Sequence, residues 1–407
     1  MKTEFSASLL NSADGQLANE ILRTCVHCGF CNATCPTYQI LGDENDGPRG
    51  RIYLIKQMLE NKEVSDATRT HLDRCLTCRN CETTCPSGVE YSKLLEIGRK
   101  AVEERTTRNF KERITRKALL NLLPYRSRFT PAIKLGQIFK PFLPKTIAKK
   151  IPKRVSKGTY PVENLDRQMI VLEGCVQPAL SPDINSATAR VLHRLGISLI
   201  RPKSAGCCGA VNQHLADEDK ALVFIKNNID AWWEYIDNGV EAIVITASGC
   251  GAMVKDYAHI LRNDKDYAEK AKKVSALCKD ISEIIINEEY TQLINQDTNR
   301  PNISWHPPCT LQHGQKINGV VEKILGDCGF NLLPVIDSHL CCGSAGTYSI
   351  LQPEISQKLQ INKITHLQKN KPELIVTGNI GCQTHLQEAS DVPVIHWIHL
   401  LDQPERT

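Results

Sequence analysis

The sequence predicts an α+β multidomain protein, in which a mostly helical N-terminal domain precedes a duplicated α/β cysteine-rich domain. Two cysteine runs of identical spacing occupy the first 105 residues, beside stretches with a helical pattern. From residue 166 onwards, short apolar runs alternate with helical patterns, which indicates α/β units with mainly parallel strands. We therefore expect four regions: a helical domain at 1–105, a basic linker at 106–165, and two α/β repeats at 166–290 and 300–400.

Two predicted helices define the N-terminal domain. Pro48–Glu60 begins with proline, a residue that is common at the first helical position. Gly88–Glu104 follows the second cysteine run. Both cysteine runs should then lie in loops beside helices.

The first repeat is predicted from three strands and two helices. The strands are Met169–Leu172, Ile197–Ile200 and Ala242–Thr246. One helix starts at Ser181, an N-cap residue followed by proline, and runs to about Leu195. A longer helix covers about Ala216 to Tyr235.

The second repeat follows the same order. Its predicted strands are Ile303–His306, Asn331–Ile336 and Leu374–Thr377, and its predicted helices are Gln315–Leu325 and Pro353–Lys369. Cys175, Cys207 and Cys250 recur after 134, 134 and 132 residues, as Cys309, Cys341 and Cys382. Matched offsets in register with the elements indicate a duplication. All six positions follow strands, where ligands of parallel α/β units gather.

The composition is ordinary for a soluble globular protein, with 41% hydrophobic and 23% charged residues among 407. No apolar run approaches the ~20 residues of a membrane span. The N-terminus lacks the apolar stretch of a signal peptide, so we expect a cytoplasmic protein, free or on the cytoplasmic face of a membrane. In a reducing compartment, 18 cysteines point to metal or redox chemistry rather than to disulfides.

The linker is strongly basic. Thr106–Pro161 contains 15 Lys/Arg and one acid, whereas the whole chain has a net charge of only +5. A basic stretch that also carries Leu, Ile and Phe can dock on an anionic membrane surface or an acidic partner. A solvated connector is the alternative. Its prolines should limit any long helix; they are Pro124, Pro131, Pro141, Pro144 and Pro152. Nucleic acid is not an expected partner, because no recognised module is present and aromatic residues are few.

Both cysteine runs read Cys-x2-Cys-x2-Cys-x3-Cys-Pro. Three thiolates at this spacing can hold three corners of a cubane cluster, but the chain cannot turn tightly enough to add the fourth. In two-cluster ferredoxins, the fourth cysteine of each run ligates the other cluster. The N-terminal domain is thus predicted to be ferredoxin-like, with two [4Fe–4S] clusters. The first cluster would be held by Cys25, Cys28, Cys31 and Cys85, and the second by Cys75, Cys78, Cys81 and Cys35.

Zinc is the rival interpretation of these runs, but zinc sites favour two separated cysteine pairs. Positive charge near a cluster would raise its reduction potential. Four arginines lie close to the runs, although each is equally well explained as an ordinary surface residue; they are Arg49, Arg51, Arg74 and Arg79.

The Cys-Cys-Gly motifs of the two repeats form a second candidate site for redox or metal chemistry. One set is Cys175, Cys207, Cys208 and Cys250, and the other is Cys309, Cys341, Cys342 and Cys382. A cluster, zinc or a purely structural role remain open for both sets. Cys278 and Cys328 match nothing in the repeat and are expected to be structural.

Motifs for substrate or nucleotide chemistry are absent. The chain contains no G-x-G-x-x-G, P-loop, G-x-S-x-G or H-E-x-x-H motif, so no catalytic residue is predicted. Histidines near the cysteines are expected to be structural; they are His27, His306, His313, His339 and His385. Any two-electron oxidation should occur on a partner, and we expect that partner to be a flavoprotein.

The cysteine runs and their surroundings resemble the family of bacterial glycolate oxidase (glycolate dehydrogenase) iron–sulfur subunits. The resemblance covers nearly the whole chain and is weakest in the basic linker. The stretches that carry it are Leu22–Glu60, His71–Val89, Leu172–Pro182, Ala205–His214, Asn227–Trp233, Thr246–Ala252, Asp337–Ile350 and Asn379–Leu386.

The resemblance implies an enzyme of three parts that oxidises glycolate, and D-lactate as well. FAD would be bound by a partner subunit and not by this chain, which would transfer electrons without oxidising substrate alone. Electrons would pass towards the membrane quinone pool, with the chain peripheral on the cytoplasmic face of the inner membrane. The eight cysteines of the two runs carry over as the cluster ligands.

The C-terminal half also resembles the cysteine-rich domains of heterodisulfide reductase and anaerobic glycerol-3-phosphate dehydrogenase subunits. There the third motif often ends as C-x-x-C, whereas Met253 and His385 occupy the last position here. The unusual cluster of those reductases is therefore not implied. The rival functions are a disulfide-reductase-like subunit, or an electron-transfer subunit for another substrate such as lactate or glycerol 3-phosphate.

Overall fold

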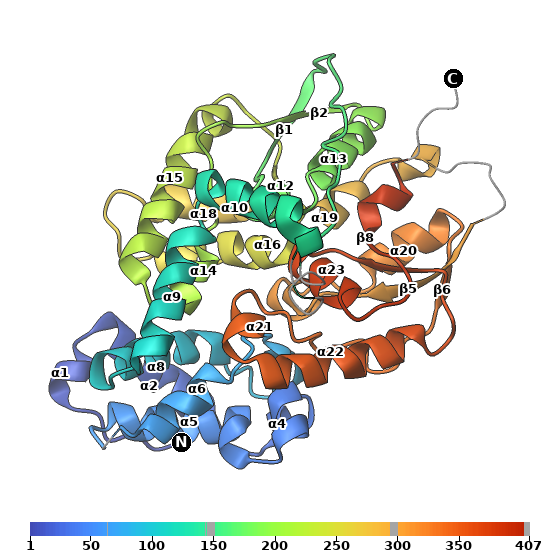
Figure 1. Cartoon of the computed structure of the whole chain (residues 1–407). Coiled ribbons are helices and arrows are strands. Elements are labelled where there is room, and N and C mark those ends of the chain that lie inside the picture. The colour runs from blue at the N-terminus through green and yellow to red at the C-terminus, as the bar shows by residue number, and fades with distance from the viewer. Residues whose placement is uncertain (63, 143, 145–150, 294–299, 403–407) are drawn as a thin grey trace. The chain divides into compact units, whose positions relative to one another are not determined.

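The computed structural model describes residues 1–62, 64–142, 144, 151–293 and 300–402 (Figure 1). The chain divides into two compact units. Unit 1 consists of Met1–Lys117, Gln213–Ala216 and His339–Lys363. Unit 2 consists of Ala118–Asn212, Asp217–Ser338 and Ile364–Thr407.

Unit 1 is helical, as the sequence predicts. The predicted helix at 48–60 is α5 (Pro48–Leu59), and the one at 88–104 is α8 (Tyr91–Arg105). The other helices of the N-terminal segment are α1 (Ala7–Leu10), α2 (Ala13–Thr24), α3 (Phe30–Ala33), α4 (Pro36–Leu41), the 3-10 turn Glu44–Asp46, α6 (Asp66–Asp73) and α7 (Asn80–Thr84). Helix ends follow local chemistry: the hydroxyls of Ser12 and Ser65 cap α2 and α6.

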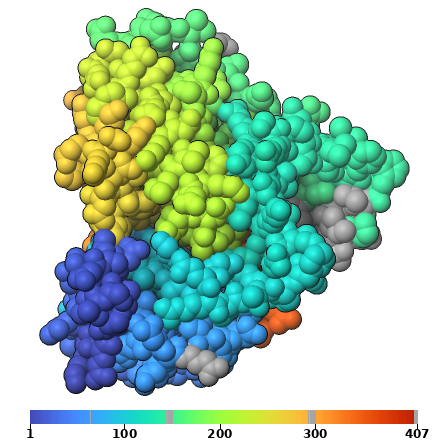
Figure 2. Space-filling model, turned by 90° about the vertical axis from the view of Figure 1, so that its left-hand side faces the viewer, coloured from blue at the N-terminus to red at the C-terminus, as the bar shows by residue number. Residues whose placement is uncertain are grey.

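The core of unit 1 lies between α2, α5 and α8. Leu22, Ile55 and Leu94 contribute fully buried side chains to it from the three helices. Gly98 allows close packing, because a Cβ there would lie 2.7 Å from the Cγ1 of Ile55. In the space-filling view, the dark-blue N-terminal residues form a continuous surface with light-blue residues of the same unit (Figure 2).

Unit 1 also includes a segment from the C-terminal half, His339–Lys363, with the short helix α21 (Tyr348–Leu351) and the start of α22 (Pro353–Gln368). The Tyr348 hydroxyl donates to the backbone oxygen of Arg74 over 2.9 Å. The Asn80 amide donates to the backbone oxygen of His339 over 3.3 Å. These bonds attach the segment to the second cysteine run.

Unit 2 contains two parallel sheets of four strands each. The first has the order β2-β1-β3-β4, built from β1 (Arg167–Val171), β2 (Ile197–Ile200), β3 (Ile243–Ile245) and β4 (Cys278–Asp280). The second has the order β6-β5-β7-β8, built from β5 (Asn302–His306), β6 (Asn331–Leu333), β7 (Leu374–Thr377) and β8 (Val394–His396). The identical order and the parallel pairing confirm the predicted α/β duplication.

The structure contains the helices that the sequence predicts for the repeats, although several begin a few residues later than predicted. The helix predicted from Ser181 is α13 (Asp183–Arg194), and the long helix is α15 (Glu218–Asp237). In the second repeat the helix predicted from Gln315 begins later, as α20 (Val320–Asp327), because Lys316 and Gly319 take left-handed conformations between it and a π-helical turn at Thr310–Gly314. The remaining helices are α12 (Gln177–Leu180), α14 (Ala210–His214), α16 (Ser248–Lys255), α17 (Tyr257–Ile260), α18 (Ala268–Leu277), α19 (Ile281–Ile285) and α23 (Ile380–Gln387).

The basic linker is more helical than its prolines suggest. It contains α9 (Phe110–Leu122) and α10 (Arg126–Phe139), and Pro131 lies inside α10. Pro124 separates the two helices, whereas Pro131 is tolerated within one. Residues 145–150 of the predicted linker lie outside the described part of the chain. None of the described helices is both long and apolar enough to cross a membrane.

The two sheets of unit 2 share one hydrophobic core. Val171, Val244, Ile303 and Val376, from both sheets, are buried in it. His396 links the repeats at this core: its Nε2 lies 2.9 Å from the backbone oxygen of Thr246, while its Nδ1 accepts the Ile398 amide over 3.2 Å. This pattern fixes the neutral Nε2–H tautomer. Burial accordingly lowers the pKa of His396 to about 3.

A buried neutral histidine makes unit 2 sensitive to acid. The unfolded chain takes up the proton of His396 near its usual pKa of 6.5, while the folded chain resists until about 3. Stability should therefore be fully present above pH 6.5 and fall as the pH drops, by about 2 kcal/mol from this group at pH 5. All four tryptophans belong to unit 2, so their fluorescence in urea reports its unfolding.

His396→Gln supplies the control for this prediction. The variant should be less stable than the natural chain at pH 7, because the two hydrogen bonds are disturbed. Its loss of stability between pH 7 and pH 5 should be smaller, because the titrating group is gone. An unchanged pH dependence would contradict the assignment of the acid sensitivity to His396.

Candidate metal centres

Two cavities in unit 1 are each lined by four cysteines of the predicted sets. Cavity A is lined by Cys25, Cys28, Cys31 and Cys85, and Cys81 also reaches its wall. Cavity B is lined by Cys35, Cys75, Cys78 and Cys81. Each cavity thus combines three cysteines of one run with the fourth of the other run.

Backbone conformation explains how each run curves around its cavity. Left-handed residues alternate with the cysteines: His27 and Gly29 have φ of 60° and 88°, and Thr77 and Arg79 have φ of 54° and 60°. At Gly29 a Cβ would also lie 2.7 Å from the Arg49 side chain. The helices α3 and α7 begin directly after these turns. The turns repeat at equivalent positions of both runs, so the two cysteine loops share one backbone conformation.

Three of the cysteines that line the cavities hold their thiol protons more tightly than a free cysteine does. Burial raises the pKa of Cys31 to about 11, and it raises the pKa of Cys25 and Cys81 as well. A metal binds the thiolate and releases these protons. The donor set of four sulfurs from two loops suits iron–sulfur ligation.

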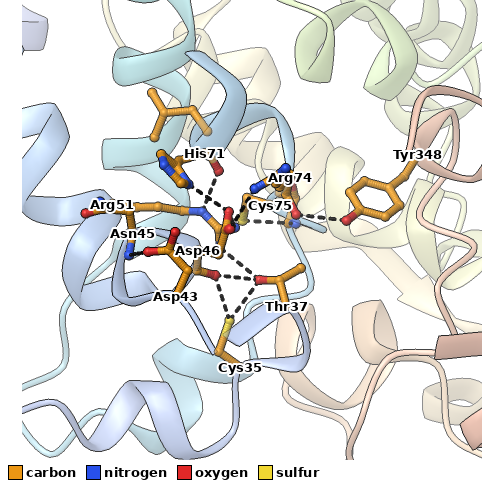
Figure 3. Close-up of polar contacts among 12 residues, drawn as sticks. Cys35, Thr37, Asp43, Asn45, Asp46, Arg51, His71, Arg74, Cys75 and Tyr348 are labelled. Atoms are coloured by element: carbon orange, nitrogen blue, oxygen red, sulfur yellow. Dashed lines mark hydrogen bonds and ion pairs between the residues drawn. The ribbon is translucent and has the colours of Figure 1, made fainter. Parts of the chain in front are cut away.

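A buried ion-pair network supports the wall of cavity B (Figure 3). Asp46 and Arg51 are almost fully buried, with the Arg51 Nη2 lying 3.5 Å from the Asp46 Oδ1. Arg74 Nη1 donates to Asp46 Oδ2 over 2.9 Å, and His71 Nδ1 lies 3.0 Å from Asp46 Oδ1. Arg51 also donates through Nε to the backbone oxygen of His71 over 2.7 Å. The network ties α5 to α6.

Thr37 joins this network to a cysteine of cavity B. Its hydroxyl lies 3.2 Å from the Sγ of Cys35 and 2.7 Å from the backbone oxygen of Asp46. It also accepts a hydrogen bond from Arg51 Nη1 over 3.1 Å. Burial by itself would lower the pKa of Arg51, but Cys75, Tyr91, Cys35 and Asp46 raise it overall, so the guanidinium stays charged. A fixed positive charge therefore stands beside the sulfur ligands.

Sequence reasoning identified part of these surroundings and missed the rest. Arg51 and Arg74 belong to the network, whereas Arg49 forms an ion pair of 2.6 Å with Glu44 at cavity A. Asp46 and Thr37 were not singled out. No local signal marks them, because their importance comes from burial beside residues distant in the sequence.

The first Cys-Cys-Gly set converges inside unit 2. The thiol of Cys207 is hydrogen-bonded to those of Cys175 and Cys208, and Cys208 is also bonded to Cys250. Donation from Cys207 and Cys250 lowers the pKa of Cys208, while the pKa of each donor is raised. The four sulfurs form a continuous chain of contacts, buried except at the half-buried Cys250, which can hold a metal or form a reducible pair.

Polar side chains fix the backbone of this motif. Asn228 is fully buried and donates to the Cys207 oxygen over 2.8 Å, while the Tyr257 hydroxyl donates to the Cys208 oxygen over the same distance. Gly209 takes φ of 91° at the turn. The predicted need for glycine there agrees with its left-handed conformation.

The second Cys-Cys-Gly set is divided between the units. Cys341 and Cys342 belong to unit 1, and Cys309 and Cys382 belong to unit 2. In unit 1 the amide of Gly343 lies 3.4 Å from the Cys341 Sγ, and a Cβ at Gly343 would lie 2.6 Å from the Ser356 oxygen. In unit 2 the Asn379 amide lies 3.5 Å from the Cys382 Sγ.

The two remaining cysteines are buried in hydrophobic cores. Cys278 and Cys328 are each only 1% exposed. Burial raises the pKa of Cys278 to about 12 and raises that of Cys328. Both therefore behave as small apolar residues.

Comparisons with known proteins add family information to this geometry. A model of the 4Fe-4S dicluster domain matches residues 21–89, and a model of the cysteine-rich domain matches 169–255 and 303–387. The glycolate oxidase iron-sulfur subunit of Escherichia coli (strain K12) is 52% identical over 404 residues, covering 99% of both chains. The probable glycolate oxidase iron-sulfur subunit of Bacillus subtilis (strain 168) is 29% identical over 91% of this chain and 88% of its own.

A shorter relative covers only part of the chain. Lactate utilization protein A of Oceanobacillus iheyensis is 26% identical over 56% of this chain and 93% of its own. The likeness therefore extends beyond proteins named for glycolate.

The buried network predicts a large difference between two neighbouring arginines. Arg51→Met should destabilise unit 1 by about 3 kcal/mol, because it leaves the buried Asp46 with fewer partners. Arg49→Met is the matched control and should cost under about 1 kcal/mol, because its pair with Glu44 is partly exposed. The free energy of unfolding of each variant is measured by far-UV circular dichroism in urea. Tryptophan fluorescence does not report on unit 1, because unit 1 has no tryptophan. Equal losses in the two variants would contradict a special role of the Arg51 network.

Proposed function

Because the chain belongs to the family of glycolate oxidase iron–sulfur subunits, we propose that it is the electron-transfer subunit of a glycolate dehydrogenase complex. The complex would oxidise glycolate, and D-lactate as well, to the corresponding 2-oxo acid. The observation that carries the proposal is the pair of cavities in unit 1, each lined by three cysteines of one run and the fourth cysteine of the other. The chain itself oxidises no substrate.

The cysteine donor set fits two cubane clusters. The proposed ligands of the first are Cys25, Cys28, Cys31 and Cys85, and those of the second are Cys75, Cys78, Cys81 and Cys35. Bound [4Fe–4S] clusters supply one-electron redox chemistry at potentials set by charge, hydrogen bonding and exposure.

The residues around the cavities have three tasks in this proposal. The left-handed turns at His27 and Thr77 aim the sulfurs inwards. The guanidinium of Arg51 places positive charge beside the second set, which favours acceptance of an electron there. The Thr37 hydroxyl gives its single proton to the backbone oxygen of Asp46 and accepts from Arg51, so it holds the guanidinium beside Cys35.

The oxidation itself requires a partner. We expect FAD on a dehydrogenase subunit of the same complex, because hydride chemistry belongs to such a cofactor and the chain lacks nucleotide motifs. The acceptor of the electrons would be the membrane quinone pool or another acceptor.

The proposed location is the cytoplasmic side of the inner membrane, as a peripheral protein. Support comes from α10 and the turn after it, where Leu135, Ile138, Phe139 and Phe142 are exposed beside lysines such as Lys134 and Lys140. Exposed apolar residues interspersed with lysines suit an anionic lipid surface.

The first Cys-Cys-Gly set is proposed as an additional redox or metal site. Its support is the continuous contact of the four sulfurs of Cys175, Cys207, Cys208 and Cys250. For the second set the proposal rests on the repeated motif of Cys309, Cys341, Cys342 and Cys382 alone.

Iron analysis of the anaerobically purified chain tests the ligand assignment. The natural chain should carry about eight irons in the ferredoxin-type sites. Cys85→Ser should weaken the cluster of the first run, although Cys85 belongs to the second run, and Cys35→Ser should weaken the cluster of the second. Each variant should lose up to about four irons. The double variant Cys28→Ser/Cys85→Ser should lose no more iron than Cys85→Ser alone, because both residues hold the same cluster. Loss of about eight irons in the double variant would contradict the crossed assignment.

Cys328→Ser is a suitable control, because Cys328 is buried in the hydrophobic core of unit 2 and belongs to no proposed ligand set. It should keep the full iron content. Iron clearly above eight that falls in Cys207→Ser would assign a further cluster to the first Cys-Cys-Gly set. Glycolate oxidation by the isolated chain would contradict the proposed function itself.

A further inference from the structure

The cavity A side of unit 1 carries an exposed apolar face. Val26 is 68% exposed, Phe30 is 62% exposed and Tyr53 is 46% exposed. They flank Cys28, the one exposed cysteine of the two runs. The ring of His27, next to Cys28, lies 6.3 Å from the Tyr53 ring, so the residues form one surface, here called the Cys28 face.

The second cysteine run shows that the loop does not require such exposure. Val26 corresponds to Leu76 and Phe30 corresponds to Asn80, since each lies 50 residues later in the repeated run. Leu76 is only 6% exposed and Asn80 only 2%. Two loops with the same left-handed turns therefore differ in whether they are covered.

The cover of the second run is part of the chain itself. Asn80 donates to the backbone oxygens of Thr34 and His339, over 3.1 Å and 3.3 Å. Tyr348, from the same segment as His339, donates to the backbone oxygen of Arg74. Among the described residues, no equivalent segment shields Val26 and Phe30 of the first run from solvent.

The low charge of the Cys28 face favours a protein partner over a membrane. The loop Val26–Phe30, which supplies most of the face, contains no lysine, arginine, aspartate or glutamate. Arg49, the one charged residue among the described residues that line cavity A, pairs with Glu44 over 2.6 Å. An anionic lipid surface is recognised by clusters of lysine and arginine. In contrast, apolar and aromatic side chains without net charge are typical of the centre of a protein–protein interface.

We propose that the Cys28 face is the docking surface for the FAD-bearing subunit, through which electrons enter the chain. The inference rests on the proposed function, since it requires a flavoprotein donor. An exposed cysteine ligand at the centre of an apolar face brings a donor close to the iron site while excluding water. Each transfer would remove one electron from the partner's reduced flavin and place it on the cluster held by Cys25, Cys28, Cys31 and Cys85. Two transfers return the flavin to its oxidised form, and its protons pass to solvent.

The test uses the complex co-expressed with its flavoprotein subunits. Val26→Glu and Phe30→Glu place charge on the face without altering a ligand, and Val223→Glu is the matched control, because Val223 is 66% exposed on α15 in unit 2. Iron content and the EPR spectrum of the reduced chain establish that each variant is folded and loaded. Val26→Ser and Phe30→Gln serve as milder changes if the charged variants lose iron.

The double variant of the face should bind the flavoprotein at least about tenfold more weakly than the natural chain, a loss of ~1.4 kcal/mol. Glycolate should reduce its clusters correspondingly more slowly in the complex, while dithionite reduces them fully. Val223→Glu should behave as the natural chain does in both measurements.

Three results would overturn the inference. Natural binding and natural reduction rates in the double variant would exclude the Cys28 face as the docking surface. Retained flavoprotein binding with lost binding to vesicles of phosphatidylglycerol and phosphatidylethanolamine would assign the face to the membrane. Failure of the natural chain to bind any flavoprotein would overturn the proposed function as well as the inference. The first two results would overturn the inference alone.

Discussion

The arrangement of unit 1 depends on one geometric constraint: a short cysteine run can supply three sulfurs to a cavity but not the fourth. The two runs must therefore cross, so that Cys85 reaches cavity A and Cys35 reaches cavity B. Beside the two cavities, α2, α5 and α8 pack into one core, where Gly98 allows the close approach of α5 and α8. The turn before α5 holds Asp46, which lies in the buried network with Arg51 and His71.

The two cavities are alike in their backbone and unlike in their surroundings. Cavity B has a buried cation and a cover from the chain's own C-terminal half, whereas Cys28 and its apolar neighbours leave one side of cavity A exposed. Positive charge favours the reduced form of a cluster, and exposure favours contact with a donor. The difference suits a one-way path, in which electrons enter at cavity A and are held at cavity B.

From the spacing within each run, the sequence predicts two crossed sets of cysteines, and the same sets line cavities A and B. That these sets ligate clusters stays a prediction. The parallel repeats are also predictable from the sequence. Short apolar runs alternate with helical patterns, and Cys175 and Cys207 recur at a fixed offset. The strands β4 and β8 are not predicted, because each has only three residues, too few to show the alternating apolar pattern of a strand. Asp46 and Thr37 escape it because their roles arise from burial against distant segments. Pro131 leads to a wrong expectation, because proline predicts a helix break and α10 continues through it.

EPR spectroscopy of the anaerobically purified chain, reduced in steps, tests the central claim most directly. The account predicts two [4Fe–4S]⁺ signals that appear at different potentials, and that broaden through magnetic interaction once both clusters are reduced, because the crossed runs place the cavities side by side with Cys81 reaching both. A single signal, or two signals without interaction, would contradict the crossed two-cluster arrangement on which the rest of the account depends.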